Sequence, residues 1–104
     1  MKQEIIVKLR GIVNGIPRGV TFDAHYVIKE FFKSEADLYL ECSGKSIATW
    51  HSNLAKEIRK FEEDGIIRKL PEKHYSETLV GSFRPNTAWK KLTGDTFSDN
   101  LPEV

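Results

Sequence analysis

The side chains best suited to ligand recognition recur between residues 46 and 64, on one side of an expected helix. They are Thr49, Ser52, Asn53, Lys56, Arg59 and Lys60. Their hydroxyl, amide and cationic groups can make hydrogen bonds or ionic contacts to phosphates, and an Asn amide can bond two adjacent positions on an adenine edge. This spacing predicts non-covalent recognition of a nucleic acid. The alternative is an ordinary helix with a polar outer face.

A second, smaller group of candidate contacts lies further along the chain. Lys73 and His74 fall in the turn-prone segment 71–77, where they could form the tip of a β-hairpin and reach a nucleic-acid backbone or minor groove. Arg84, on the expected return strand, could add a phosphate contact. Because Glu72 and Glu77 flank the same turn, an ordinary exposed loop is the alternative interpretation.

The element that must position the first group is a long amphipathic helix. Its apolar residues recur at steps of three and four, which places them along one face: Ile47, Trp50, Leu54, Ile58 and Phe61. Gly65 can take the left-handed conformation that often ends a helix. The apolar segment 66–70 follows at once and predicts a strand.

This helix end resembles the recognition helix and first wing strand of winged helix-turn-helix DNA-binding domains. The residues that fill the superfamily's apolar, acidic and glycine positions are Leu54, Ile58, Phe61, Glu62, Gly65, Ile66 and Ile67. The resemblance implies an α+β fold, with three to four helices and a small antiparallel β-hairpin wing. It also implies double-stranded DNA binding, by a small transcriptional regulator or an accessory DNA-binding protein. In helix-turn-helix docking the N-terminal half of the recognition helix enters the major groove, and that half carries Thr49, Ser52, Asn53 and Lys56.

The rest of the chain supplies elements to surround this helix. Hydrophobic periodicity predicts helices over 2–14 and from about 23 to 33, the second capped by Thr21 or Asp23. Segment 20–22 is expected to provide a third strand. Segment 35–42 fits a short helix, although a strand is also compatible with its pattern. We place the return strand of the hairpin at 78–84, before the strand-breaking Pro85.

Composition fits one compact domain over residues 1–91, followed by an acidic and disordered tail over 92–104. The 104 residues are 39% hydrophobic and 30% charged, and no apolar run approaches the length of about 20 residues that spans a bilayer. Because the N-terminus lacks the features of a signal peptide and Cys42 is the only cysteine, a cytoplasmic protein is expected.

Charge is distributed unevenly along the chain. Residues 1–43 carry six basic and six acidic side chains, residues 44–91 carry ten basic and six acidic ones, and residues 92–104 carry three acids. The half with the expected helix and wing is therefore the basic half, which is what a nucleic-acid surface would show. The alternative is a solvated surface of mixed charge. The acidic tail is expected either to screen this half or to be inert.

Catalysis, cofactors and metals are not expected. Residues 44–46 read Gly-Lys-Ser as in a P-loop, but Tyr39 stands where that motif needs a glycine. Cys42 is interpreted as a small hydrophobe and His51 as a core-edge residue, and no metal-ligand spacing joins them.

Trp89 has two interpretations, either packing onto the domain or anchoring a partner surface. The alternative function for the whole chain is a protein-interaction module that does not bind DNA. Its partner would be another protein or a second copy of the chain.

Overall fold

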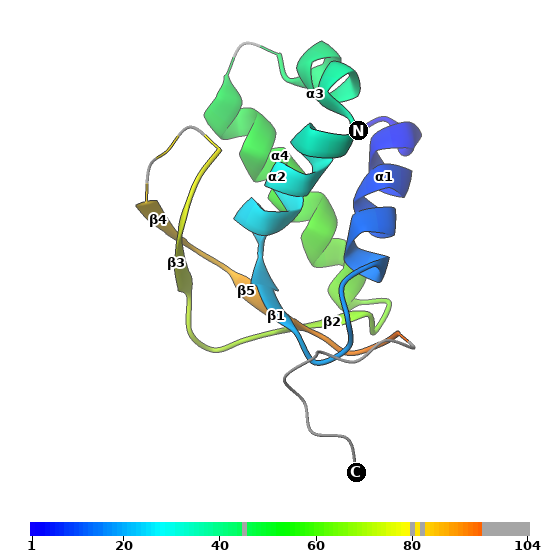
Figure 1. The fold of residues 1–104 in the computed structure, drawn as a ribbon, viewed down its shortest axis with the longest axis vertical. Coiled ribbons are helices and arrows are strands. Elements are labelled where there is room, and N and C mark those ends of the chain that lie inside the picture. Colours follow the sequence, from blue (N-terminus) through cyan, green and yellow to red (C-terminus); the bar gives the residue numbers. More distant parts are fainter. Residues whose placement is uncertain (45, 80, 82, 95–104) are drawn as a thin grey trace.

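The computed structural model describes residues 1–44, 46–79, 81 and 83–94. The tail expected over 92–104 therefore lies almost entirely outside the described residues. The described part is α+β with antiparallel sheets, which confirms the fold class at that level. In Figure 1 the helices lie together above a small sheet, and a two-stranded ribbon rises beside them.

The helices begin and end close to where the sequence predicts. They are α1 (Gln3–Asn14), α2 (Ala24–Ser34), the short α3 (Ala36–Cys42) and α4 (Ile47–Arg59), which a 3-10 turn extends over Lys60–Glu62. Local capping explains two of the starts. The side chain of Asp23 accepts a hydrogen bond from the Tyr26 amide at 2.9 Å, and Ser46 accepts one from the Thr49 amide at 3.3 Å. Gly65, with φ of 73°, ends the last turn.

One hydrophobic core joins the helices to the sheet. Leu9 of α1, Phe31 of α2 and Leu54 of α4 are fully buried in it. Trp89 belongs to the same core at 1% exposure, so its packing interpretation is confirmed and the partner-anchor interpretation is wrong.

The three-stranded sheet has the order β1-β5-β2 and is antiparallel throughout. Its strands are β1 (Thr21–Asp23), β2 (Ile67–Lys69) and β5 (Ala88–Lys91), and β5 lies between the other two. Phe22 and Lys69 both pair with Trp89, from the two sides of β5. The third strand expected near 20–22 is thus present and pairs with the C-terminal strand.

The hairpin is longer than predicted, and its tip lies elsewhere. Strand β3 (His74–Glu77) pairs with β4 (Phe83–Asn86), so the chain reverses over 78–82 and not over 71–77. The predicted return strand at 78–84 is therefore wrong, and Lys73 and His74 do not form the tip. Pro85 lies within β4 opposite Tyr75. A proline is tolerated there because a two-stranded ribbon leaves every second N–H without a ladder partner.

The ribbon formed by β3 and β4 bends toward the helices. Lys69 pairs with Trp89, and His74 pairs with Asn86. Residues 70–73 separate the first residues of these two pairs, whereas only residues 87–88 separate the second. Extra residues on one strand act as a bulge, which bends a ribbon and increases its twist. The bend carries β3 and β4 up beside α2 and the start of α4 (Figure 1).

One member of the predicted apolar stripe of α4 is not in the core. Trp50, Leu54, Ile58 and Phe61 are buried, whereas Ile47 is 48% exposed. Ile47 is the first residue of the helix, so the buried part of the stripe begins one turn later, at Trp50.

Candidate nucleic-acid interface

The outer face of α4 is accessible along its length. Trp50, Leu54 and Ile58 fix the helix to the core. The opposite face presents the predicted site residues Thr49, Ser52, Asn53, Lys56 and Lys60, all of them exposed. Sequence periodicity therefore separated core positions from surface positions correctly on this helix, apart from Ile47.

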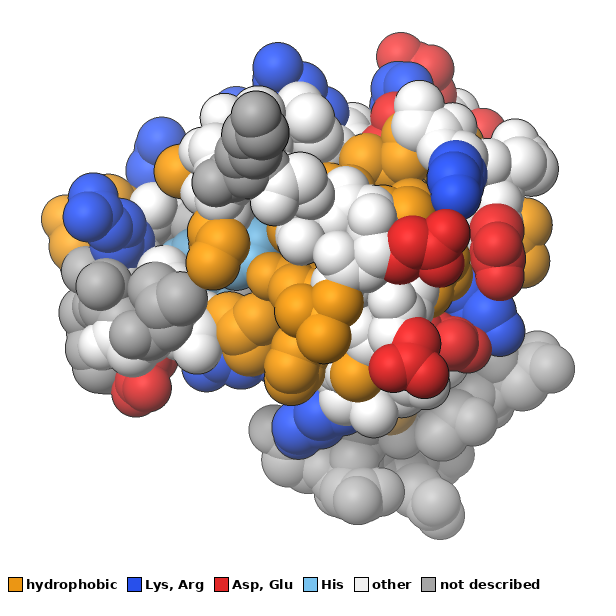
Figure 2. All heavy atoms as spheres, turned by 90° about the horizontal axis from the view of Figure 1, so that it is seen from above, with side chains coloured by type: hydrophobic (Ala, Val, Ile, Leu, Met, Phe, Trp, Pro, Cys, Tyr) orange, Lys and Arg blue, Asp and Glu red, His pale blue; other side chains and the backbone are white. Residues whose placement is uncertain are grey.

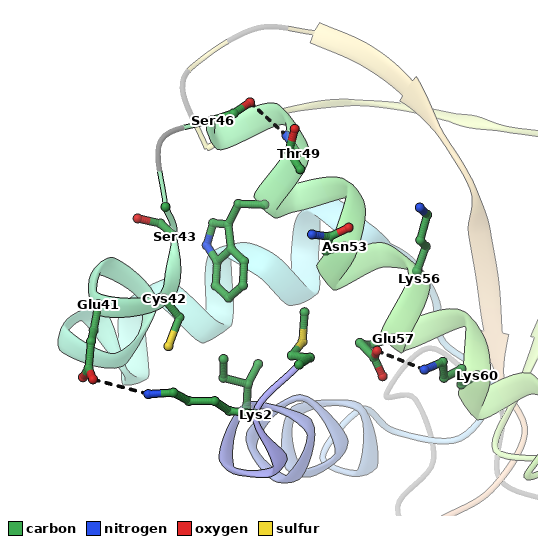
Figure 3. A pocket seen from close by; sticks show the side chains of 14 residues that line it. Lys2, Glu41, Cys42, Ser43, Ser46, Thr49, Asn53, Lys56, Glu57 and Lys60 are labelled. Carbon is green, nitrogen blue, oxygen red and sulfur yellow. Dashed lines mark hydrogen bonds and ion pairs between the residues drawn. The ribbon is translucent and has the colours of Figure 1, made fainter.

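Two hollows flank this face of α4. One, which we call the α1–α4 cavity, has a volume of about 900 Å³ and lies between α4, the start of α1 and the end of α3. Thr49, Asn53, Lys56 and Lys60 line it (Figure 3). The other, the ribbon groove, has a volume of about 670 Å³ and separates α4 and α2 from the β3–β4 ribbon. Ser52 lines this groove, so the predicted face is divided between two hollows.

The two lysines of this face differ in their electrostatic environment. Lys60 Nζ lies 3.0 Å from Glu57 Oε1, so a carboxylate already compensates its charge. Lys56 has no ion-pair partner among the described residues. Of these two lysines, Lys56 is therefore the better placed to meet a phosphate.

The structure brings Arg84 and Ser52 to the same groove. Arg84 is exposed on β4 and lines the ribbon groove opposite α4. Lys73 is exposed in the segment before β3 and is not among the residues that line the ribbon groove. The predicted wing residues therefore do not act from one tip.

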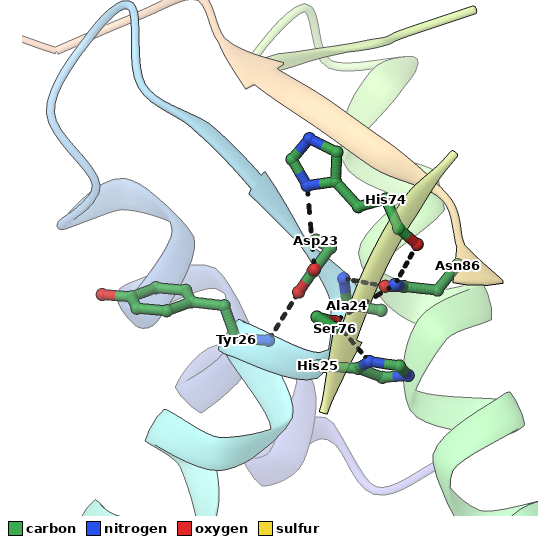
Figure 4. A network of polar contacts seen from close by, with 7 residues as sticks. All are labelled: Asp23, Ala24, His25, Tyr26, His74, Ser76 and Asn86. Carbon is green, nitrogen blue, oxygen red and sulfur yellow. Dashed lines mark hydrogen bonds and ion pairs between the residues drawn. The ribbon is translucent and has the colours of Figure 1, made fainter. Parts of the chain in front are cut away.

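His74 is part of an anchor between the ribbon and the start of α2 (Figure 4). Its Nδ1 lies 3.8 Å from Asp23 Oδ2, and its carbonyl accepts a hydrogen bond from Asn86 Nδ2 at 3.1 Å. Asn86 Oδ1 accepts a hydrogen bond from the Ala24 amide at 3.1 Å. Ser76 Oγ lies 2.6 Å from His25 Nδ1, in hydrogen-bonding contact. The β3–β4 ribbon is thus fixed to the N-terminus of α2 by side chains from both elements.

His51, which lines the ribbon groove, is a poor candidate for phosphate contact. Burial lowers the pKa of His51, and nearby His25 contributes to the decrease. Burial also raises the pKa of Tyr39, whose hydroxyl lies 2.6 Å from His51 Nε2, in hydrogen-bonding contact. His51 is therefore neutral near pH 7 and is half-buried at the edge of the core, as expected. Figure 2 shows histidine surface inside a hollow beside a group of hydrophobic side chains.

A basic pair that sequence analysis did not identify lies on the outer face of the sheet. Arg68 of β2 and Lys90 of β5 are directly paired, and Lys90 also pairs with Thr21 of β1. Like charges placed opposite each other destabilise a sheet, and neither cation has a carboxylate partner among the described residues. Sequence analysis did not identify this pair because it placed the return strand at 78–84. Lys90 therefore had no expected strand partner.

The described residues contain no group of three or more His, Cys, Asp or Glu side chains able to hold a metal ion. In the same part of the chain, no helix is both long and apolar enough to cross a membrane. The chain matches no protein-family model, and comparisons with curated proteins and with solved structures found no significant similarity.

Proposed function

We propose that this chain is a winged helix-turn-helix domain that binds double-stranded DNA, as a small transcriptional regulator or an accessory DNA-binding protein. The order of the elements supports the fold. Helices α2 and α4, with the short α3 in their connection, precede a hairpin whose return strand β5 lies between β1 and β2. The sequence at the end of α4 resembles the same superfamily.

The observation that carries the functional proposal is the accessible polar face of α4. Thr49, Asn53 and Lys56 are exposed on a helix whose opposite face is buried in the core. An α-helix with its side chains is about 10–12 Å across, and the major groove is about 12 Å wide, so this face can enter it. Asn53 would read a base edge, while Lys56 would neutralise a phosphate.

The basic residues of the hairpin would contact the DNA backbone. Arg84 stands across the ribbon groove from Ser52, and Arg68 and Lys90 form the basic pair on the sheet. Phosphates would compensate the repulsion of that pair, because no carboxylate among the described residues does so. Fixing the ribbon to α2 would hold Arg84 at a constant distance from α4.

The test is fluorescence anisotropy with a labelled mixed-sequence duplex at several salt concentrations, followed by selection of a preferred site. Binding should weaken steeply with salt. Lys56→Ala should weaken all duplexes similarly and reduce the salt slope by about 1. Asn53→Ala should reduce discrimination between the selected and random duplexes by about 1–3 kcal/mol.

Lys33→Ala is the matched control for Lys56→Ala. Lys33 is an exposed lysine at the end of α2, in a hollow between α1 and α2, and its Nζ atom forms an ion pair with Glu30 Oε2 at 3.3 Å. Its removal changes net charge equally but should leave the affinity almost unchanged. Absence of binding at low salt, or equal losses in the two lysine variants, would contradict the proposed face.

A specific observation also favours a second function, a protein-interaction module. Exposed Ile47 lines the ribbon groove together with Ile28 and Pro85, which gives this hollow an apolar character. Apolar surface of this kind is common at protein interfaces. If the chain fails to bind DNA at low salt, Ile47→Asp is the variant with which to test a candidate protein partner.

A further inference from the structure

The outer edge of strand β3 has no strand beside it. Among the residues that the structure describes, β3 pairs only with β4. The ribbon stands beside the helices at the margin of the molecule (Figure 1). Tyr75, within β3, is 73% exposed. An uncovered strand edge presents unpaired N–H and C=O groups, which form a template for a further strand.

Pro85 determines which backbone groups this edge presents. In an antiparallel ladder, pairs that exchange two N–H···O bonds alternate with pairs that exchange none. Tyr75 lies opposite Pro85, which has no N–H, so this pair belongs to the second kind. The N–H and C=O groups of Tyr75 therefore point away from β4, to the outer edge of β3. On the other side of the ribbon, Pro85 leaves the edge of β4 without a donor at this position, so β3 offers the better edge for a further strand.

The charges along this edge are complementary to those of a second copy of the chain. Residues 73–77 read Lys-His-Tyr-Ser-Glu, with Tyr75 at the centre. When two such edges pair antiparallel with Tyr75 opposite Tyr75, each Lys73 lies opposite the Glu77 of the other copy. Lys73 and Glu77 are both exposed, and neither has an ion-pair partner among the described residues. Opposite charges at directly paired positions stabilise a sheet, whereas like charges destabilise it.

The side chains that would meet lie on the outer face of the ribbon. Successive side chains of a strand point to opposite faces. His74 and Ser76 are turned toward the start of α2 (Figure 4). Lys73, Tyr75 and Glu77 therefore project from the other face, into solvent. A second β3 strand can approach without disturbing the anchor between the ribbon and α2, and it brings two Tyr75 rings side by side.

We propose that two copies of this chain form a homodimer by antiparallel pairing of their β3 strands about a two-fold axis at Tyr75. The two Tyr75 residues exchange N–H···O=C hydrogen bonds, and the two Lys73–Glu77 pairs flank them. The ribbons then form one continuous sheet of order β4-β3-β3-β4. A two-fold interface uses the same patch on both copies, as this self-complementary edge does. The dimer would also direct two copies of α4 to an inverted repeat, a consequence that rests on the function proposed above.

The test is sedimentation equilibrium of the full chain over a series of protein concentrations, without DNA. The contact is short, so the dimer should be weak and its fraction should rise with concentration. Lys73→Glu places carboxylates opposite each other, and Glu77→Lys does the same with ammonium groups. Each should weaken dimerisation at least about tenfold. The double variant exchanges the two charges, which restores both pairs and should recover the wild-type dimerisation constant. An equimolar mixture of the two single variants should form a heterodimer for the same reason.

Glu63→Lys is the matched control for Glu77→Lys, because Glu63 is exposed and lies outside the ribbon. It should leave the dimerisation constant unchanged. Amide hydrogen exchange of the wild-type chain provides a second measurement. The Tyr75 amide should become more protected as the protein concentration rises, whereas the Ser76 amide, which faces β4, should be protected at every concentration.

Four results would overturn the proposal. They are a monomer at every concentration, single variants that dimerise as well as the wild-type chain, a double variant that does not recover, and Tyr75 exchange that is independent of concentration. Since no DNA is present, these outcomes are independent of whether the chain binds DNA.

Discussion

The indole of Trp89 donates a hydrogen bond from Nε1 to Glu62 Oε2, 3.2 Å away. This contact joins the return strand β5 to the end of the α4 segment. Trp89 is 1% exposed, so its donor cannot turn to solvent without unpacking the core. The two elements proposed to contact DNA are therefore coupled through one hydrogen bond beneath the surface.

Replacing Glu62 should destabilise the protein. Glu62→Ala leaves the Trp89 donor buried without an acceptor, which should cost about 1–3 kcal/mol in the free energy of unfolding. Glu63→Ala is the matched control, because Glu63 is exposed and the hydrogen bond from Trp89 goes to Glu62. Urea denaturation of the three proteins measures the difference. Equal stability of the two variants would show that the hydrogen bond contributes nothing.

Two residues of the predicted apolar stripe should respond differently to truncation. Phe61 is 2% exposed, and the Arg10 guanidinium lies 4.7 Å from its ring centre. Phe61→Ala should cost about 3–5 kcal/mol. Ile47→Ala should change stability by no more than about 0.5 kcal/mol, because Ile47 is exposed. Thermal melts of both variants provide the check, and a large loss for Ile47→Ala would place that residue in the core.

Asn86 should matter for both the ribbon and α2. Asn86→Ala removes the acceptor of the Ala24 amide and the donor to the His74 carbonyl. We expect a loss of about 0.5–2 kcal/mol, comparable to removal of a helix N-cap. Hydrogen exchange should accelerate at the Ala24 amide and along β3 and β4. Unchanged exchange at these amides would contradict the role of Asn86 as an anchor, and Thr87→Ala is the neighbouring control.

The stability of the protein should depend on His51 in mildly acidic solution. Burial lowers the pKa of His51 from 6.5, so the unfolded chain binds its proton more readily than the folded protein. The contribution of neutral His51 is fully present above pH 6.5 and declines as the pH falls from there toward the pKa of the folded state. Between neutral and mildly acidic pH, the unfolding free energy of His51→Gln should therefore decrease less than that of the wild-type protein. Parallel pH profiles for the two proteins would refute this.

Local signals in the sequence were sufficient for the helices. The cap at Ser46, the apolar steps of α4 and the stop at Gly65 all involve residues within a few positions of one another. The same holds for Asp23 at the start of α2. The exposed face with Asn53 and Lys56 could be predicted for this reason, because helical periodicity alone determines which side faces solvent.

The hairpin could not be predicted in the same way. Pro85 was interpreted as a strand breaker, yet its missing N–H is harmless at its position in a two-stranded ribbon. That error displaced the tip and hid the pairing of Arg68 with Lys90. Strand register depends on pairing between distant segments, and propensity along one segment does not specify it.

The sequence by itself determined the helices, the α+β class and the polar face of α4, because these follow from spacing within a single segment. Tertiary structure alone decided the anchor between Asn86 and α2 and the bond from Trp89 to Glu62. Each of these depends on which atoms from separate segments meet in the folded core. Residue type and spacing along the chain carry no such information.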